Sequence, residues 1–520
     1  MKRILTIFAF GVALQATSAP ASETPHFAAE TKSSGIDVQY RGEEMTYMTG
    51  GGLAAFDCSG DGKPELFFTG GAGTSRLYKN LSRKGSALKF DIELSSGLEL
   101  ERNVGAYPLD VDSDGHVDLL LLRIGENILY RGQGDCTFRR ANEDWNFDGG
   151  NAWSSAFSAT WEAGQTWPTM VVGNFLDRGT ITMGYGDCDD NHLYRPNKKG
   201  DGFAPLEALT PGHCALSMLF SDWNRDGVAD LRVSNDMEFY RFGEEQLFQF
   251  SENGPKLYPR EEGWQEVKIW GMGIAAHDVT GDGYPEYYLT NITDNRFEVL
   301  ADGASKPHYQ DKAKAFNIVA GQPFAGGDTR ASTGWHAEFG DVNNDGRADL
   351  LVVKGKVEAG NFAADADPNN LLIARADGTF KEGAEEAGVL SFKTGRGGSL
   401  VDLNDDGKLD LVVSNRNHTA EIWRNVSAGI GNWLKLGLGS KAVGSWVEVK
   451  TGEHVQRREV TIGGGHAGGQ WGALHFGLGE AKQAQVRTQS PGREWGPWIT
   501  VQANQMMSIE HGDAKVISWR

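Results

Sequence analysis

A chain of 520 residues exceeds what one compact core usually supports, and 69 glycines among short apolar runs favour an all-β fold in two domains. The formal net charge of −20 argues against nucleic acid and anionic membrane surfaces as partners. No segment reaches the length of about 18 apolar residues that a membrane-spanning helix needs, so we expect no membrane insertion.

The first 21 residues predict a signal peptide rather than part of the fold. Lys2 and Arg3 precede an apolar stretch that runs from Ile4 to Leu14, and the small residues at 19–21 fit a cleavage site. We therefore expect an exported protein, either periplasmic or secreted.

Six acidic stretches of one pattern follow, and each leads into an apolar run. The first reads DCSGDGKPELFF from Asp57, and the fifth reads DVNNDGRADLLVV from Asp341. The six starts lie 53, 112, 56, 63 and 61 residues apart. The doubled interval predicts a divergent seventh copy around VVGNFLDRGTITMGY, with Asn174 in the first position. Seven copies at one period predict a propeller or a solenoid. The remaining copies begin at Asp110, Asp222, Asp278 and Asp402.

Each copy predicts four strands. A glycine-rich apolar strand precedes the acidic loop, a second apolar strand follows it, and an aromatic-bearing third strand and a fourth segment complete the copy. The seventh copy ends at EIWRN without a fourth segment, whereas HFAAETKSSGI at residues 26–36 resembles FKEGAEEAGV at 380–389. We therefore expect residues 22–427 to form a seven-bladed β-propeller that the N-terminal strand closes, which leaves no open edge.

The four cysteines predict two disulfides, because the chain is expected to be exported. In an up-and-down strand order, Cys58 and Cys136 lie on one face in adjacent blades. Cys188 and Cys214 lie on the other face, again in adjacent blades. Only the pairs Cys58–Cys136 and Cys188–Cys214 keep each bridge on a single face, and free thiols are the alternative.

The acidic loops have the composition of calcium sites. In the loop that starts at Asp341, oxygens at positions 1, 3, 5 and 9 and the position-7 carbonyl of Arg347 can point inward, and Gly346 permits the sharp turn. The last acid falls at position 9 and a strand follows, so the loop is not an EF-hand. A turn without metal is the alternative for any single loop, but six copies in register favour about six Ca²⁺ ions. The predicted side-chain ligands are Asp57, Ser59, Asp61 and Glu65; Asp110, Asp112, Asp114 and Asp118; Asp222, Asn224, Asp226 and Asp230; Asp278, Thr280, Asp282 and Glu286; Asp341, Asn343, Asp345 and Asp349; and Asp402, Asn404, Asp406 and Asp410.

The divergent third copy predicts no metal. Leu176 stands in place of the position-3 ligand, and Arg178 stands in place of the position-5 aspartate. We expect the guanidinium of Arg178 to take the place of the cation by its charge.

These loops and strands resemble the FG-GAP/VCBS repeats of integrin α-type propellers, over roughly residues 26–427. The resemblance implies Ca²⁺ that rigidifies the loops on one face of the ring, and ligands that bind the other face.

Residues 430–520 predict a small β-sandwich-like domain, because period-2 alternation and glycine turns continue there without metal or nucleophile signatures. The order NWL, GSWVEV, REVTIGGGHAGGQ and HFGLG resembles an ASPIC/UnbV domain. The chain departs from that pattern at Ser490-Pro491-Gly492, where a Trp-Pro-x-Gly usually stands. Repeats and domain together resemble the bacterial relatives of cartilage acidic protein 1, which implies this architecture and no settled reaction.

The sequence favours a binding module over an enzyme. No HExxH, GxSxG or GxGxxG motif is present, and we expect His466, in a glycine-rich loop, to bond to the backbone. The other histidines considered are scattered: His213, His336, His418 and His475.

A candidate ligand site lies where four cations from different blades enter the first strands, accompanied by two tryptophans, and it would suit an anionic ligand or an acidic partner protein. Pairing with local acids such as Glu101 and Glu266 is the alternative. The predicted residues are Arg102, Lys268, Trp270, Arg330, Trp335 and Arg396.

We therefore expect a calcium-binding adhesion or scaffold protein that performs no catalysis itself. The alternative is an envelope enzyme, or an accessory to one, that uses the central-channel face. A purely structural role for Ca²⁺ is a third possibility.

Overall fold

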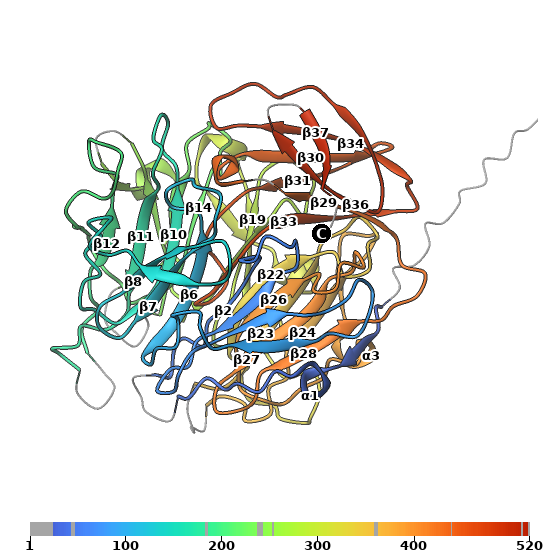
Figure 1. Ribbon diagram of the computed structural model, residues 1–520, viewed down its shortest axis with the longest axis horizontal. Coiled ribbons are helices and arrows are strands. Elements are labelled where there is room, and N and C mark those ends of the chain that lie inside the picture. The colour runs from blue at the N-terminus through green and yellow to red at the C-terminus, as the bar shows by residue number, and fades with distance from the viewer. Residues whose placement is uncertain are drawn as a thin grey trace, which may run out of the picture.

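The computed structural model confirms the predicted all-β class (Figure 1). The expected signal peptide at residues 1–21 lies outside the described residues. No helix within the described part of the chain is long and apolar enough to cross a membrane. The structure describes residues 24–42, 47–181, 186–236, 243–251, 254–357, 362–437, 439–510 and 513–517.

Seven antiparallel sheets are formed between residues 27 and 425, and six of them are built from four consecutive strands. In the first sheet a further strand, β32, adds to the edge beside β2. In sheet order the strands are β2 (Leu53–Phe56), β3 (Glu65–Phe68), β4 (Arg76–Asn80) and β5 (Phe90–Glu93); β6 (Asn103–Leu109), β7 (Asp118–Arg123), β8 (Ile128–Gly132) and β9 (Phe138–Arg140); β10 (Ser154–Thr160), β11 (Thr169–Asn174), β12 (Asn191–Tyr194) and β13 (Glu207–Leu209); β14 (Ala215–Ser221), β15 (Asp230–Asn235), β16 (Gln246–Gln249) and β17 (Lys256–Leu257); β18 (Ile274–His277), β19 (Glu286–Leu289), β20 (Arg296–Leu300) and β21 (Tyr309–Asp311); β22 (Gly334–Gly340), β23 (Asp349–Lys354), β24 (Asn370–Ala374) and β25 (Phe380–Glu382); and β26 (Gly395–Val401), β27 (Asp410–Asn415) and β28 (Glu421–Asn425) with β1 (Phe27–Ala29).

Each sheet runs from a buried first strand to an exposed last strand. Every residue of β6, β10, β14 and β26 is buried, whereas β9 and β13 expose two of their three residues. The first strands are rich in glycine, alanine and serine, and these small side chains allow neighbouring first strands to approach closely. Each first strand contacts the first strand of the next sheet, and β26 contacts β2.

The N-terminal strand β1 completes the last sheet, as the unpaired fourth segment of the seventh copy suggests. It pairs antiparallel with β28, with Phe27 opposite Asn425. The short helix α1 (Thr31–Ser34) follows β1 and ends at Gly35 with φ 92°, and α3 (Ala384–Ala387) follows β25 and ends at Gly388 with φ 80°. The two similar sequence stretches therefore form the same strand-and-helix unit. The remaining short helices of this region are α2 (Ala313–Phe316), η2 (Arg260–Glu262) and η3 (Gly303–Ser305).

Two further four-stranded sheets form the C-terminal domain and pack around a core that includes Leu434, Val447, Phe476 and Val486. One sheet has the order β33-β29-β36-β37, and the other has the order β31-β30-β34-β35. Strand β32 leaves this domain and pairs in parallel with β2. The bounds are β29 (Asn432–Gly437), η4 (Ser440–Ala442), β30 (Trp446–Thr451), β31 (His454–Glu459), β32 (Gly469–Trp471), β33 (Ala473–Gly479), β34 (Gln483–Gln489), β35 (Ile499–Gln502), β36 (Gln505–Glu510) and β37 (Asp513–Ile517).

Both predicted disulfides are present. Cys58 bonds to Cys136 and Cys188 bonds to Cys214, and each pair of Cα atoms lies 4.8 Å apart. Each bridge joins neighbouring sheets, so the argument from loops on one face selected the correct pairing.

Candidate metal centres

Each of the six acidic loops joins the first strand of its sheet to the second, and all six share one hydrogen-bond pattern. The position-1 aspartate accepts the N–H of the position-6 glycine, from Gly62 on Asp57 at 2.6 Å to Gly115 on Asp110 at 3.2 Å. In five loops the position-9 carboxylate also accepts the N–H of the second residue, as Asp349 does from Val342 at 2.9 Å. These bonds turn the carboxylates toward the inside of the loop.

Several of these carboxylate oxygens are buried without a hydrogen-bond partner among the described residues. They are Oε1 of Glu65, Oδ1 of Asp222 and Oδ1 of Asp278, on residues that are at most 8 % exposed. A buried carboxylate oxygen without a partner costs free energy that a bound cation would offset. The donor atoms are carboxylate, amide, hydroxyl and carbonyl oxygens, which are the ligands that Ca²⁺ prefers.

The pKa values of the loop carboxylates also favour a bound cation. Burial raises the pKa of Glu65, Asp118 and Glu286 to about 8 in each case, and neighbouring loop carboxylates add to the effect. Burial together with the Asp345 carboxylate raises the pKa of Asp341 to about 8. The protein alone therefore disfavours the charged form of these groups, and a divalent cation would favour it.

The loop that starts at Asp110 gathers its carboxylates most closely. One oxygen from each of Asp110, Asp112 and Asp114 lies within 4.8 Å of the others. Arg131 Nη2 lies 2.8 Å from Asp112 Oδ2 and 2.9 Å from Asp114 Oδ2. A cationic group therefore already lies beside this cluster.

The third copy differs from the expectation for Arg178. Its Nη1 donates to the backbone carbonyl of Asn151 at 3.0 Å and to Asn151 Oδ1 at 2.6 Å. Asn174 is held instead by Ser154, whose hydroxyl donates to Asn174 Oδ1 at 2.8 Å. Arg178 therefore bonds to the neighbouring loop that contains Asn151. The absence of metal from this copy stays a prediction.

A glycine-rich segment of the C-terminal domain, residues 462–471, lies among the first strands of the seven sheets. Ile462, Gly463, Gly465 and Gly468 form single bridges with β10, β14, β18 and β6, and β32 then pairs with β2. A Cβ atom on Gly468 would overlap the carbonyl of Leu53, so only glycine allows this approach. We call residues 462–471 the channel segment.

His466 at the centre of the channel segment is fully buried. Its Nδ1 lies 2.8 Å from the carbonyl of Met272, its Nε2 accepts the N–H of Gly50, and its own N–H donates to His336 Nδ1 at 3.1 Å. Burial lowers the pKa of His466 to about 3, so the ring is neutral. The expectation that His466 bonds to the backbone is confirmed.

One comparison with known proteins concerns this C-terminal part. Residues 437–516 match the family described as ASPIC and UnbV. The C-terminal domain is therefore similar to the ASPIC and UnbV family, and we call it the ASPIC/UnbV domain. The chain is 25% identical to human cartilage acidic protein 1 over 158 residues, which cover 30% of this chain and 22% of the human protein. The mouse protein is 25% identical over 159 residues, which cover 30% of this chain and 23% of the mouse protein. The similarity thus spans less than a quarter of these relatives.

The similarity to solved structures is weak. BBS1N in complex with ARL6DN has a TM-score of 0.43 at 8% identity and covers 75% of this chain and 94% of that chain. An Agrocybe aegerita protein that recognises non-reducing terminal N-acetylglucosamine has a TM-score of 0.39 at 14% identity, covering 70% of this chain and 88% of that chain. Similarity at this level carries no inference about function.

Two residues of the predicted ligand site, Arg396 and Trp335, face the interior beside the ASPIC/UnbV channel segment. They are 0% and 1% exposed, and the guanidinium of Arg396 lies 4.0 Å from the centroid of the Trp335 ring. Arg396 donates to the backbone carbonyls of Met48 at 3.1 Å and Gly355 at 3.2 Å. The Trp335 ring in turn contacts His466. In this structure the pair holds the channel segment and is closed to a ligand.

The other members of the predicted ligand site lie nearer the surface. Lys268 pairs with Glu266 at 2.6 Å, which is the alternative that the sequence left open. Arg330 pairs with Asp328 at 2.7 Å and with Asp365 at 2.6 Å. Arg102 is exposed and Trp270 is half-buried. The structure thus divides the six residues between a buried pair and scattered surface positions.

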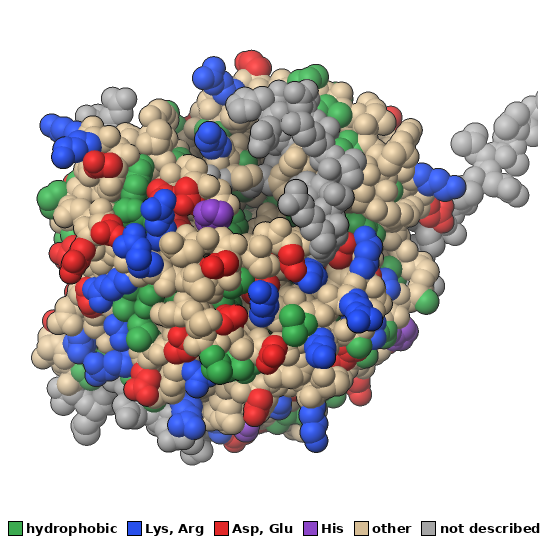
Figure 2. Space-filling view, in the orientation of Figure 1, with side chains coloured by type: hydrophobic (Ala, Val, Ile, Leu, Met, Phe, Trp, Pro, Cys, Tyr) green, Lys and Arg blue, Asp and Glu red, His purple; other side chains and the backbone are tan. Residues whose placement is uncertain are grey.

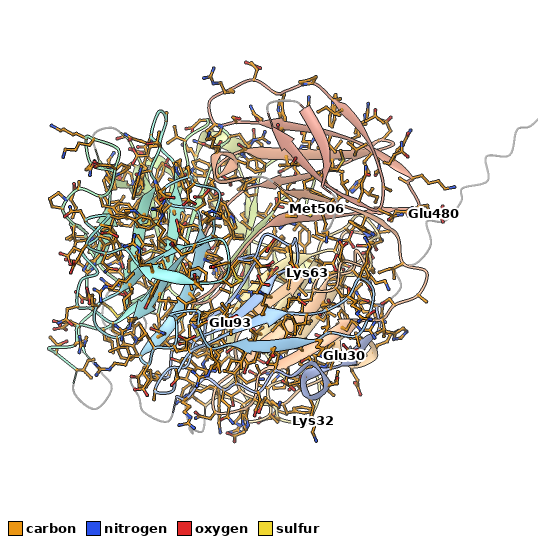
Figure 3. The ribbon with its side chains drawn as sticks, viewed as in Figure 1. Glu30, Lys32, Lys63, Glu93, Glu480 and Met506 are labelled. Carbon is orange, nitrogen blue, oxygen red and sulfur yellow. A yellow bond between two sulfur atoms is a disulfide. The ribbon has the colours of Figure 1, made fainter. Side chains whose placement is uncertain are left out.

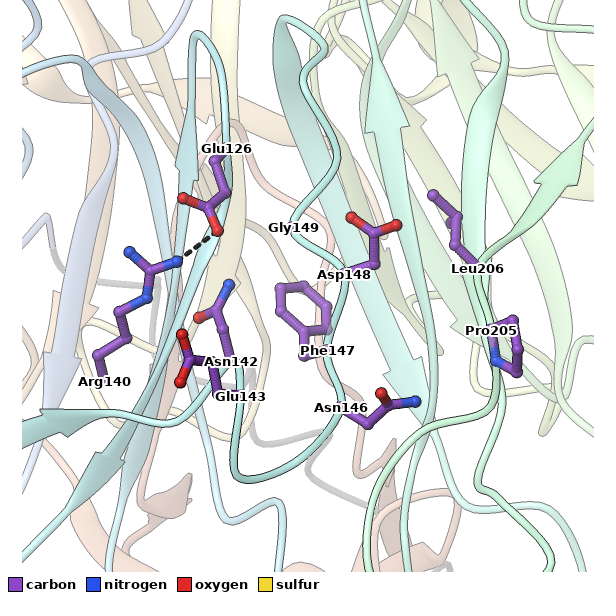
Figure 4. Close-up of a pocket in the computed structure, with 10 residues that line it drawn as sticks. All are labelled: Glu126, Arg140, Asn142, Glu143, Asn146, Phe147, Asp148, Gly149, Pro205 and Leu206. Carbon is purple, nitrogen blue, oxygen red and sulfur yellow. Dashed lines mark hydrogen bonds and ion pairs between the residues drawn. The ribbon is translucent and has the colours of Figure 1, made fainter.

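The described surface mixes charges of both signs and carries a pocket beside the second sheet. Figure 2 shows Lys and Arg interspersed with Asp and Glu on the face that it presents. Figure 4 shows a pocket of about 540 Å³ near the end of the second sheet, where Glu126 forms an ion pair with Arg140. Asn142, which also lines this pocket, bonds through its amide to the backbone of Asn127 and Leu129. These polar groups therefore serve the local fold.

Proposed function

We propose that the seven sheets form a closed seven-bladed β-propeller of FG-GAP/VCBS type. Support comes from one interaction that recurs between neighbouring sheets. Asn425 Nδ2 donates to the carbonyl of Val342 at 2.8 Å, and Asn80 Nδ2 donates to the carbonyl of Leu403 at 2.8 Å. The first sheet therefore contacts the last sheet in the same way as the last contacts the sixth.

The six acidic loops of this propeller are Ca²⁺ sites in our proposal. The predicted ligands at positions 1, 3, 5 and 9 would hold the ion, with the position-7 carbonyl. The supporting observation is the set of buried carboxylate oxygens that lack a partner among the described residues, at Glu65, Asp222 and Asp278. A bound ion supplies positive charge that fixes each loop between its two strands.

The protein acts, in this proposal, as an exported calcium-stabilised scaffold that binds a protein or ligand on its outer surfaces. The observation that supports this choice is the position of the channel segment among the first strands, because this segment and the Arg396–Trp335 pair would occupy the centre of the proposed ring, where a channel ligand would bind. The same observation argues against the enzyme alternative that uses the central channel. Similarity to cartilage acidic protein 1 and the two disulfides support an extracytoplasmic module.

Capture from the native envelope tests the scaffold role. The purified, tagged chain should retain a specific partner in Ca²⁺ at about 1 mM and lose it in EGTA. Bound Ca²⁺ orders the loops on one face of the proposed ring. Each site adds about 2.7 kcal/mol to the free energy of unfolding when free Ca²⁺ is in hundredfold excess over Kd. A second arm uses His336→Gln, which alters the channel and leaves the outer surface intact. If this variant folds but no longer retains the partner, the partner binds at the central channel and not on the outer surface.

A further inference from the structure

The fourth residue of every acidic loop has a left-handed backbone conformation. The φ values run from 53° at Asp405 to 75° at Gly281. The predicted ligands occupy the odd positions, so the fourth residue is left at the tip of the loop. Its identity differs from loop to loop: Gly60, Ser113, Arg225, Gly281, Asn344 and Asp405.

Four of these tips contact the ASPIC/UnbV domain. An arginine takes part in the contacts of two of them, Arg225 and Gly281. Arg225 Nη2 donates to Gln489 Oε1 at 2.8 Å, and its guanidinium lies 4.2 Å from the centroid of the Trp446 ring. The carbonyl of Gly281 accepts from Arg457 Nη1 at 3.2 Å. Gln489, Trp446 and Arg457 all belong to the sheet β31-β30-β34-β35.

The other two tips, Asn344 and Asp405, contact the sheet β33-β29-β36-β37 of the domain and the linker that precedes it. The carbonyl of Asn344 accepts the N–H of Gly479 at 2.8 Å, and its side-chain amide donates to the carbonyl of Gly431 at 3.3 Å. Asp405 Oδ1 lies 2.8 Å from Lys435 Nζ, and both side chains are buried. Figure 1 shows the strands of this domain, in red, against one side of the remaining sheets.

Two predicted metal ligands form ion pairs with side chains of the domain. Asp402 Oδ2 lies 2.9 Å from Lys435 Nζ, and Asp278 Oδ2 lies 3.4 Å from Arg457 Nη1. The glycine at position 6 is covered as well, since a Cβ on Gly407 would overlap the ring of Trp433. The domain therefore contacts the metal loops at their tips, their glycines and their first ligands.

At the loops of Asp57 and Asp110, the fourth residues Gly60 and Ser113 make no hydrogen bond or ion pair of this kind with the domain in the part of the chain that the structure describes. A Cβ atom on Gly60 would meet no atom of the described structure within 4 Å, and the same holds for Gly281, whose contact with the domain is made by its carbonyl oxygen. Asp114 is exposed, and its ion pair comes from Arg131 of its own sheet. In Figure 3 Lys63 marks the first loop, where its Nζ pairs with Asp61 of the same loop at 2.7 Å.

Covering a carboxylate-rich loop is costly unless its charge is neutralised. At the loop of Asp278, three carboxylates outnumber the charge of one Ca²⁺ by one, and Arg457, which also pairs with Glu448 at 2.7 Å, brings a positive charge beside them. At the loop of Asp402, Asp405 adds a carboxylate, which lies 2.8 Å from Lys435 of the domain and 2.8 Å from Lys84 of the first sheet's loop. Domain cations and a bound metal are therefore complementary rather than competing.

We propose that cation binding at the loops of Asp222, Asp278, Asp341 and Asp402 is coupled to docking of the ASPIC/UnbV domain, through the fourth residue of each loop. The loops of Asp57 and Asp110 bind their cations independently of docking. The inference rests on the proposed calcium function. Because the channel segment belongs to the docked domain, loss of the cation from a covered loop loosens that segment from the ring.

Hydrogen exchange of the full chain, combined with calcium titration, tests the coupling. Asp406→Asn and Asp114→Asn each remove the charge of a position-5 ligand, and the ion pairs of both aspartates in the described structure are with residues outside the ASPIC/UnbV domain. Each variant should lose one Ca²⁺. Only Asp406→Asn should speed exchange in residues 462–471, by about tenfold, within the usual range of coupling between sites. Equal exchange in the two variants would overturn the coupling, whereas a wild-type chain that binds no Ca²⁺ would overturn the proposed calcium function instead.

A second pair of variants tests the fourth residues without touching a ligand. Arg225→Ala removes a contact with the domain, and Ser113→Ala changes the same position of an open loop. Coupling is reciprocal, so Arg225→Ala should weaken one Ca²⁺ site about fivefold and speed exchange in residues 462–471. Ser113→Ala should change neither readout. Unchanged calcium affinity and exchange in Arg225→Ala would refute the role of the loop tips.

Discussion

The position-9 carboxylate shows at the scale of one residue how a loop is fixed to its sheet. Asp349 Oδ2 accepts the N–H of Val342 at 2.9 Å, and its Oδ1 accepts the N–H of Ala374 at 2.8 Å. Burial and the carboxylates of Asp341 and Asp345 raise its pKa well above its usual range. One side chain thus links the acidic loop, the second strand and the end of the third strand.

Asp349→Ala should therefore lower the free energy of unfolding by about 2–5 kcal/mol, because it leaves two buried N–H groups without an acceptor. Urea denaturation in saturating Ca²⁺ measures the change. Asp377→Ala, at an exposed turn, is the matched control and should shift stability by less than about 0.5 kcal/mol. A loss below about 1 kcal/mol in Asp349→Ala would contradict this role.

His466 gives the channel a dependence on pH. Burial lowers its pKa from the usual 6.5 to about 3, and the nearby Arg396 and His336 act in the same direction. The unfolded chain then binds more protons than the folded chain between these values, so stability falls as the pH drops below about 6.5.

Comparison of the wild-type chain with His466→Gln isolates this contribution. The stability of the wild type relative to the variant should fall by up to about 1.4 kcal/mol per pH unit between pH 6 and pH 4. Urea unfolding at several pH values measures it. Parallel pH profiles of the two proteins would show that His466 titrates normally in the folded state.

At the scale of the element, the borrowed strand β1 completes a sheet whose other three strands lie about 370 residues away in the sequence. Phe27 is 8% exposed and packs in the core of the last two sheets. Glu30, labelled beside α1 in Figure 3, pairs with Arg424 of β28 at 2.9 Å. Apolar burial and an ion pair thus hold the two ends of the ring together.

Phe27→Ala should lower the free energy of unfolding by about 3–5 kcal/mol through the cavity that it leaves. Exchange of the amides in β28 should rise, because its edge loses β1. Ala29→Ser, on an exposed position of the same strand, is the control. Unchanged exchange in β28 would show that β1 does not secure this edge.

The strands, loops and disulfides could be predicted because each depends on a local pattern that the chain repeats. The third copy shows the limit of that reasoning, since nothing near Arg178 in the sequence reveals that Asn151 is within its reach. The path of the channel segment could not be predicted either. Its glycines signal close backbone approach, but not which strands they approach. The role of the fourth loop position could not be predicted, because the ligand pattern concerns the odd positions and the residue at position 4 differs from loop to loop.

At the scale of the whole molecule, one set of acidic loops serves two purposes. The fourth residues of four loops contact the ASPIC/UnbV domain, whose channel segment bridges the first strands of several sheets. The proposed metal sites would account for much of the acidic composition, because 19 of the 70 Asp and Glu residues occupy predicted ligand positions. In our proposal, stability, domain docking and charge balance therefore depend on the same cations.

The number of Ca²⁺ ions bound at saturation tests this account most directly. Equilibrium dialysis of the metal-free chain against Ca²⁺, followed by elemental analysis, should give close to six ions per chain, with none assigned to the divergent third copy. Two or fewer ions per chain would contradict the account.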